Sequence, residues 1–324
     1  MNRRISKRIL VAAFAAASVF MTSAVAHRPQ DQIDLKGRDV TILVTAHPDS
    51  DRSRAVADRL KPEDFSVREN KQLQQIISVK RPMEAPLILA VLIQDDLISR
   101  VNNEIRGIKD FIRKLPDGSR VMTAYISVGS LRIRQEFTAD RERAAESLRI
   151  LISSLTSSAY SPYEEVLDAL KHFDSETAGR RIVLLVSDGL DTSQGLRSAS
   201  PMMSVYLERA IDEAQRRGIS IFTFYASSVG LTSRSHLAMT YGQGSLNRIA
   251  DETGGEAFFA GSSFVSFDPY FREFNELLGR QWLITYRSSN FEAGFRKIEV
   301  KTDYDLELLH PAGYRLRSKD IPRP

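Results

Sequence analysis

Residues 87–281 alternate between short apolar runs and longer amphipathic segments. Three of the runs, 87–93 (LILAVLI), 182–186 (IVLLV) and 219–225 (ISIFTFY), are apolar almost throughout. This is the pattern of parallel strands that helices cover on both faces. Two further strands, at 121–127 and 131–137, are separated by a short turn, which predicts a hairpin and one antiparallel pair.

The segments between these strands place apolar side chains three and four positions apart, which predicts helices with one buried face. Gly218 follows one of them as a terminating glycine. A Ser- and Gly-rich loop is expected at 227–244, as a second candidate contact surface. The predicted helices cover 101–115, 144–155, 163–173, 205–217, 246–253 and 269–280, and a short strand covers 257–260. Alternating strands and helices predict an α/β fold with a doubly wound, mostly parallel sheet.

The segments on either side of this core are rich in β-strand patterns. Their predicted strands lie at 40–44, 65–67, 75–79, 282–286, 295–301 and 306–309. We therefore expect an α/β domain at 86–281, with a β-rich lead-in at 27–85 and a β-rich extension at 282–324. The two flanking segments are expected to form a small β-rich appendage.

Residues 1–26 have the three parts of a secretory signal peptide. Four bases lie among the first eight residues, an apolar stretch runs from Ile9 to about Met21, and Ala24-Val25-Ala26 forms a cleavage site. The stretch is shorter than the ~20 residues that cross a bilayer. We predict export by the Sec route to the periplasm or beyond. An uncleaved N-terminal anchor is the alternative.

Removal of this segment changes the charge of the chain. The full sequence has 45 Lys and Arg against 41 Asp and Glu, and the four bases of the signal bring the mature chain to 41 against 41. This balance gives no electrostatic footprint for nucleic acid. The sequence has no cysteine, which excludes disulfides, thiolate metal sites and a lipid-anchoring cysteine. We expect no stable membrane insertion after signal cleavage.

Polar clusters follow three of the predicted elements. They are Gln94-Asp95-Asp96-Leu97-Ile98-Ser99, the Ser-rich loop 157–162 before a helix, and Ser187-Asp188-Gly189-Leu190-Asp191. In open α/β sheets, ligands bind outside the carboxyl ends of the strands where the winding direction changes. These three loops are therefore the first candidates for a binding site.

An apolar strand ending in Asp-x-x-x-Ser, a Ser-rich loop and a later strand ending in Ser-Asp-Gly resemble the Rossmann-like von Willebrand factor A fold. More narrowly, the chain resembles the exported von Willebrand factor A-related proteins of Acidobacteria. That narrower resemblance rests on residues 63–67 (EDFSV), 246–256 (LNRIADETGGE) and the Gly313-Tyr314 pair. It covers nearly the whole mature chain, and it implies a protein-binding module.

In the family these loops form a metal-ion-dependent adhesion site. Asp95 matches its first acid, Ser99 its second serine, Ser161 its threonine and Asp188 its last acid. The resemblance implies Mg²⁺, or Mn²⁺ or Ca²⁺, with an acidic side chain of a protein partner completing the coordination shell.

Leu97 departs from the family pattern, because it stands at a ligand serine and supplies no oxygen. Strand alternation is expected to turn Asp96 away from the direction of Asp95. In the alternative interpretation, Asp95 and Asp188 bind no metal and cap the helices that follow.

Two other classes of function compete with adhesion. The first is a metal-independent structural subunit of an envelope assembly. The second is a hydrolase, but the sequence has no G-x-S-x-G elbow, no phosphate-binding glycine loop and no Asp-x-Asp after the first strand. Of five histidines, only His236 is expected near the loops, and a lone loop histidine is more often solvated. We therefore predict that the chain is not an enzyme.

Overall fold

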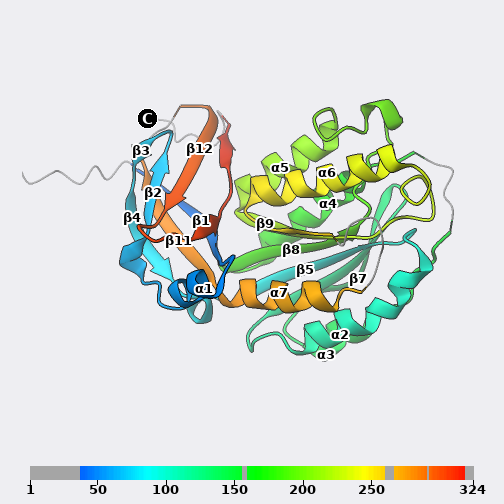
Figure 1. Ribbon diagram of the computed structural model, residues 1–324, viewed down its shortest axis with the longest axis horizontal. Coiled ribbons are helices and arrows are strands. Elements are labelled where there is room, and N and C mark those ends of the chain that lie inside the picture. Colours follow the sequence, from blue (N-terminus) through cyan, green and yellow to red (C-terminus); the bar gives the residue numbers. More distant parts are fainter. Residues whose placement is uncertain (1–36, 155–158, 260–265, 290–291, 318–324) are drawn as a thin grey trace, which may run out of the picture. The chain divides into compact units, whose positions relative to one another are not determined.

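A computed structural model of the chain describes residues 37–154, 159–259, 266–289 and 292–317. Its central sheet has six strands in the order β10-β9-β8-β5-β6-β7 (Figure 1). All neighbouring pairs are parallel except β6–β7, which is the predicted antiparallel hairpin. The strands are β5 (Leu87–Gln94), β6 (Arg120–Ser127), β7 (Ser130–Thr138), β8 (Arg180–Ser187), β9 (Ile219–Tyr225) and β10 (Ala257–Phe258).

Helices cover both faces of this sheet. Successive side chains of a strand point to opposite faces, so every residue of β5 is buried. Leu89 and Val91 pack towards α2, α3 and α7, whereas Ile88 and Ala90 pack towards α4, α5 and α6 (Figure 1). The helices are α2 (Ile105–Arg113), α3 (Arg141–Glu146), α4 (Pro162–His172), α5 (Val205–Arg217), α6 (His236–Thr253) and α7 (Asp268–Gly279). Short 3₁₀ turns cover Pro62–Asp64, Pro82–Glu84, Ser99–Glu104, Phe173–Ser175 and Leu196–Ser198. This arrangement confirms the predicted doubly wound α/β fold.

The flanking segments form two four-stranded antiparallel sheets, with orders β13-β1-β11-β4 and β14-β12-β2-β3. Each sheet combines strands from before and after the α/β core, so the shared β-rich appendage is confirmed. Trp282 in β11 packs on Phe65 at 5.2 Å between ring centroids, inside the core of this part. The elements are β1 (Arg38–His47), α1 (Asp51–Ala57), β2 (Ser66–Glu69), β3 (Gln72–Leu73), β4 (Gln75–Lys80), β11 (Gln281–Ser288), β12 (Gly294–Lys301), β13 (Glu307–Leu309) and β14 (Gly313–Leu316).

Helix α6 begins ten residues earlier than predicted and replaces much of the expected loop at 227–244. Ser235 caps it by accepting a hydrogen bond from the amide of Ala238. Its glycines allow close packing rather than a loop, since a Cβ on Gly242 would lie 2.0 Å from the carbonyl oxygen of Asp188. This contact presses α6 against the loop that follows β8.

The helix predicted at 144–155 is also wrong, because α3 ends at Glu146 and residues 148–154 are not helical. Leu155 and the loop residues Ser157 and Ser158 lie outside the described residues, as does the predicted signal segment. None of the described helices is both long and apolar enough to cross a membrane.

Candidate functional site

A pocket of about 280 Å³ lies at the carboxyl ends of β5 and β8, beside the loop that follows β9. We call it the loop-face pocket. Its wall combines two carboxyl groups, a phenol and three leucines: Asp96, Asp188, Tyr160, Leu190, Leu196 and Leu231. Strand β5 lies between β8 and β6, where the chain winding reverses, so the pocket occupies the expected ligand position of this fold.

Gln94, the last residue of β5, ties the two sides of this pocket together. Its amide nitrogen donates to Asp96 Oδ1 at 2.7 Å and to the Tyr160 hydroxyl at 2.8 Å. Its amide oxygen accepts from the Ser187 hydroxyl at 2.5 Å and from the Asp188 backbone amide at 3.0 Å. Because Gln94 is only 1 % exposed, these contacts fix the ends of β5 and β8 relative to each other.

Asp188 is buried at the pocket and its carboxylate accepts hydrogen bonds from nearby protein groups. Its Oδ1 accepts from the Leu190 amide at 3.1 Å, and its Oδ2 accepts from the Thr232 hydroxyl at 3.0 Å. Burial, reinforced by the nearby Asp96 carboxylate, raises the pKa of Asp188 to about 6. Asp188 accepts the amide of the second residue after it and caps no helix.

Asp96, not Asp95, faces this pocket. The two acids point in different directions, as expected, but the acid that matches the family's first ligand is the one turned away. Alternation at the end of β5 places Gln94 and Asp96 on one side and Asp95 on the other. Asp96 Oδ1 accepts from Gln94 and, at 3.1 Å, from the Tyr160 hydroxyl. Burial is the main cause that raises the pKa of the Asp96 carboxyl.

Asp95 pairs with Arg149 on the opposite side of the strand end. The guanidinium donates to Asp95 Oδ1 at 2.9 Å and to Oδ2 at 2.7 Å, and the Ile152 amide donates to Oδ1 at 3.1 Å. Burial alone would raise the pKa of Asp95, but the Arg149 and Ile152 hydrogen bonds hold it below its usual value. Asp95 therefore caps no helix and lines a different pocket from Asp188.

The other two predicted ligands differ in their surroundings. Ser99 is exposed at the start of the 3₁₀ turn Ser99–Glu104. Ser161 is buried at the N-cap of α4, and its hydroxyl has no hydrogen-bond partner among the residues that the structure describes. It directly follows Tyr160, which lines the loop-face pocket. Of the four predicted residues, Ser161 and Asp188 are thus buried beside this pocket, while Asp95 and Ser99 are not.

These residues do not fit the family's metal site. Leu97 is fully buried in the hydrophobic core, and Asp95 is neutralised by Arg149. The carboxyl oxygens of Asp188, and Oδ1 of Asp96, already accept hydrogen bonds from protein donors, which leaves a hard cation few free oxygens. No group of three or more His, Asp or Glu able to hold a metal ion occurs in the part of the chain that the structure describes.

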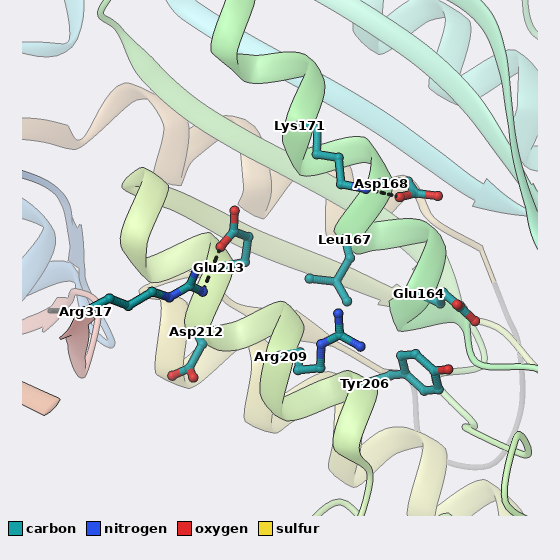
Figure 2. Close-up of a pocket in the computed structure, with 9 residues that line it drawn as sticks. All are labelled: Glu164, Leu167, Asp168, Lys171, Tyr206, Arg209, Asp212, Glu213 and Arg317. Atoms are coloured by element: carbon teal, nitrogen blue, oxygen red, sulfur yellow. Dashed lines mark hydrogen bonds and ion pairs between the residues drawn. The ribbon is translucent and has the colours of Figure 1, made fainter. Parts of the chain in front are cut away.

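A larger groove, of about 400 Å³, lies between α4 and α5 (Figure 2). Its charged groups mostly pair with one another: Lys171 with Asp168 at 2.6 Å, and Arg317 with Glu213 at 3.3 Å. These pairs point along the groove wall and do not converge on one point. The loop-face pocket, with its convergent carboxyl groups, is the better candidate for function.

Sequence reasoning placed Gln94, Tyr160 and Thr232 within its candidate loops but outside the predicted ligand set, and it missed Arg149 altogether. Counting alternate positions back from Asp96 would have placed Gln94 beside it. Tyr160 stands next to the predicted Ser161, but Thr232 and Arg149 reach the site through loops whose paths the sequence pattern does not indicate.

No protein-family model matches the chain, and no curated protein matches its sequence. Several solved structures are similar in fold. An aerotolerance-related membrane protein from Bacteroides fragilis is 12 % identical, with 60 % of this chain and 99 % of that one covered and a TM-score of 0.43. The manganese-loaded TRAP protein of Plasmodium vivax is 10 % identical (76 % and 97 % covered, TM-score 0.42). The SpRpn10 VWA domain is 9 % identical (60 % and 97 % covered, TM-score 0.39).

At these identities the similarities concern the fold and transfer no activity to this chain. The six-stranded sheet, with its parallel core and single antiparallel edge strand, has the arrangement that the resemblance to the von Willebrand factor A fold implies. The narrower resemblance to the acidobacterial proteins stays a prediction.

Proposed function

We propose that this chain is an exported protein-binding module that recognises its partner through the loop-face pocket and the loops around it. The observation that carries the proposal is the pocket itself, where the Asp96 and Asp188 carboxyl groups lie among apolar side chains at the switch point of the sheet. A mixed polar and apolar surface of this kind suits contact with a protein.

Exposed apolar side chains beside the pocket support a macromolecular partner. Leu231, which lines it, is 45 % exposed, and Leu237 at the start of α6 is 50 % exposed. Leu190, Ala199 and Ala238 form a small buried cluster, separate from the two main cores, and the partly buried Leu196 packs against it. When a partner covers leucines at the rim of a pocket, apolar surface is removed from water, and this makes the free energy of binding more favourable.

Recognition proceeds without a bridging metal ion in this proposal. The donors on Asp96 and Asp188 and the pairing of Asp95 with Arg149 support that choice. A partner instead meets a rigid, hydrogen-bonded surface whose polar groups are already oriented by Gln94.

We also favour binding over catalysis. The Ser187 hydroxyl donates to Gln94 and is not activated by a base, and no histidine lines the pocket within the described residues. Export rests on the signal-like pattern of residues 1–26.

Site-specific photo-cross-linking in the source cells tests this function. A photoreactive phenylalanine analogue replaces Leu231, and the same analogue at Met83 is the control. Met83 is 89 % exposed, lies in the turn Pro82–Glu84 and does not line the loop-face pocket. We expect one protein adduct from position 231 and none from 83, with equal yield in EDTA, and a weaker adduct when Leu196→Asp is added. Equal adducts from both positions, or none, would overturn the proposal. An adduct that requires a divalent cation would overturn its metal-independent part.

A further inference from the structure

The segment after α3 exposes two isoleucines on one side. Ile150 is 68 % exposed and Ile152 is 59 % exposed, whereas Leu148 and Leu151 are buried in the core. At the tip of the β6–β7 hairpin, Val128 is 40 % exposed. Ile152 and Val128 line the same hollow, of about 180 Å³, with Ile126 at its base. Solvent-facing aliphatic side chains gathered around a hollow mark a contact surface more often than isolated ones do.

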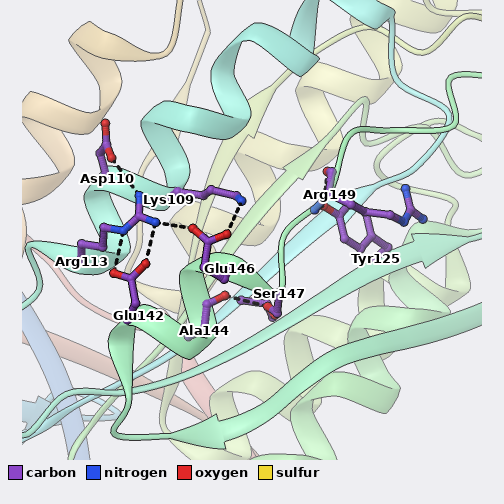
Figure 3. Close-up of polar contacts among 10 residues, drawn as sticks. Lys109, Asp110, Arg113, Tyr125, Glu142, Ala144, Glu146, Ser147 and Arg149 are labelled. Carbon is purple, nitrogen blue, oxygen red and sulfur yellow. Dashed lines mark hydrogen bonds and ion pairs between the residues drawn. The ribbon is translucent and has the colours of Figure 1, made fainter.

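This segment is rigidly held, so the exposure of its isoleucines is not a result of a loose loop. Three of its backbone amides have partners: Leu151 donates to Asn102 Oδ1 at 2.7 Å, Ile152 to Asp95 Oδ1 at 3.1 Å, and Ser153 to the Asp95 carbonyl at 3.0 Å. The Tyr125 hydroxyl donates to the Arg149 carbonyl at 2.6 Å. Figure 3 shows Arg149 beside the Tyr125 ring, whose centroid lies 4.2 Å from the guanidinium carbon.

The preceding helix is fixed as well. Arg113 of α2 donates to both carboxyl oxygens of Glu142, at 2.8 and 2.9 Å, and also binds Glu146 in α3 (Figure 3). Lys109 donates to Glu146 at 3.3 Å. The chain therefore leaves α3 in a fixed direction. Asp95 is the positioning residue for the segment that follows α3, because it accepts hydrogen bonds from the amides of Ile152 and Ser153.

Two arginines of β7 lie in or after the part of the strand that lines this hollow. Arg132 lines it, and Arg134 is exposed two positions further along β7. Neither forms an ion pair among the described residues, in contrast to Arg149, whose charge is balanced by Asp95. Asp96, the other acid at the hollow, is half-buried and faces the Gln94 and Tyr160 donors. The outer edge of the surface is thus basic.

We propose that Val128, Ile150, Ile152, Arg132 and Arg134 form a second contact surface, the basic–apolar shelf, for an extended protein segment in which aliphatic and acidic side chains alternate. The exposed Ile150 and Ile152 lie on either side of the buried Leu151. An extended partner presents every second side chain on one face, roughly 7 Å apart, and so can contact both isoleucines. The inference rests on the proposed protein-binding function. It adds the chemistry of the partner. The shelf hollow and the loop-face pocket are adjacent, because Asp96 and Tyr160 line both.

Peptide binding to the mature chain tests the shelf. The probes are capped, fluorescein-labelled octapeptides of alternating valine and glutamate, of valine and lysine, and of serine and glutamate, followed by fluorescence anisotropy. We expect only the valine–glutamate peptide to bind, more weakly as salt increases. Ile150→Ser with Ile152→Ser should weaken binding about tenfold or more, from the loss of apolar burial. Arg132→Gln with Arg134→Gln should weaken it about fivefold and remove most of the salt dependence.

Controls separate the possible failures. Met83→Ser removes an equally exposed apolar side chain elsewhere and should leave binding unchanged. Leu231→Ser alters the loop-face pocket and should also leave peptide binding unchanged, so failure of cross-linking at 231 with intact peptide binding would count against the proposed function alone. No binding, equal binding of the valine–lysine peptide, or indifference to the double isoleucine variant would overturn the shelf. Shelf-dependent binding of phosphatidylserine vesicles in place of the peptide would overturn it as well.

Discussion

Arg149 donates two hydrogen bonds to the carboxylate of Asp95, at 2.9 and 2.7 Å, and so removes from the pocket the acid that the sequence nominates first as a metal ligand. The pairing uses the side of β5 that faces away from Asp188, and it leaves Asp96 to face the pocket. Neighbouring residues at the end of a strand point to opposite sides. The acid that faces the loop-face pocket is therefore one position later in this chain than the first acid of the family's adhesion site.

The Asp95–Arg149 pair should stabilise the fold measurably. The side chain of Asp95 is 6 % exposed and that of Arg149 is 30 % exposed, so removing one partner leaves a poorly solvated charge. We expect Arg149→Gln to lower the free energy of unfolding by about 2 kcal/mol, a value reduced for the solvent that reaches Arg149. Urea unfolding of both single variants and of the double variant with Asp95→Asn should give a coupling energy of about 1 kcal/mol.

The exposed Lys171–Asp168 pair is the matched control for this cycle, with side chains 65 % and 54 % exposed. Its coupling should be below about 0.5 kcal/mol. A coupling near zero for both pairs would contradict the role given to Asp95.

The raised pKa of Asp188 predicts a specific pH dependence of stability. The pKa of Asp188 in the folded chain is about 6, above the ordinary aspartate value of 3.8, so the folded chain binds more protons than the unfolded chain between these two pH values. The free energy of unfolding should therefore decrease as pH rises from about 4 to about 6 through this group. Asp188→Asn keeps an acceptor for the Leu190 amide and should remove this slope and stabilise the chain at pH 7 by roughly 1–3 kcal/mol.

Urea unfolding of the wild type and of Asp188→Asn at several pH values checks this, because other titrating groups cancel in the difference. If the two curves stay parallel from pH 4 to 7, Asp188 ionises freely in the folded chain and the description of its environment is wrong.

The strands were largely predictable, because burial on both faces leaves a continuous apolar run in the sequence. The runs 87–93, 182–186 and 219–225 coincide with β5, β8 and β9 within two residues at each end. The hairpin and the mixed β-rich appendage also followed from local pattern. By contrast, the pairing of β1 with β11, with Val44 opposite Trp282, depends on residues more than two hundred positions apart and has no local signal.

The errors arose where tertiary contacts override local preference. Residues 148–154 carry apolar side chains at helical spacing, yet Asp95, Asn102 and Tyr125 bind their backbone groups and hold them out of a helix. The sequence pattern places Gly242 in a loop, but it lies in helix α6, where the absence of a side chain allows the helix to contact the loop after β8. The sequence places Asp95, Asp96 and Asp188 at one edge of the sheet, as the structure has them, but it does not show which of the two adjacent acids faces the pocket with Asp188.

The close contact between α6 and the loop after β8 can be tested by substituting Gly242, with Gly107 as the control. Gly242→Ala would place a Cβ 2.0 Å from the Asp188 carbonyl oxygen, so we expect a loss of about 3 kcal/mol in the free energy of unfolding. Gly107→Ala in α2 is the control, because its Cβ would meet only Phe271, at 3.7 Å. That variant should stabilise the chain by up to about 1 kcal/mol through helix propensity. Thermal and urea unfolding distinguish the two; equal effects would contradict the packing described here.

Glu69 in β2 should link this strand to β11 and β14 in the appendage. It is 2 % exposed and accepts hydrogen bonds from Tyr286 at 2.9 Å, Ser288 at 3.0 Å and Tyr314 at 3.1 Å. Glu69→Ala removes the acceptor that three buried hydroxyl groups share and should cost about 3 kcal/mol, whereas Glu299→Ala on the neighbouring strand, 42 % exposed, should cost less than about 0.5 kcal/mol. Urea unfolding of both variants tests this. Comparable losses would show that the buried carboxylate is not the link.

Thermal unfolding of residues 27–324 in EDTA, and then with millimolar Mg²⁺, Mn²⁺ or Ca²⁺, tests the metal-independent loop face most directly. A cation that bound only the folded chain at a hundredfold excess over its dissociation constant would stabilise it by about 2.7 kcal/mol, which corresponds to roughly 5 °C or more in a chain of this size. We expect the unfolding midpoint to stay within about 1 °C for every cation. A rise of several degrees that Asp188→Asn abolishes would show instead that the pocket binds a metal ion.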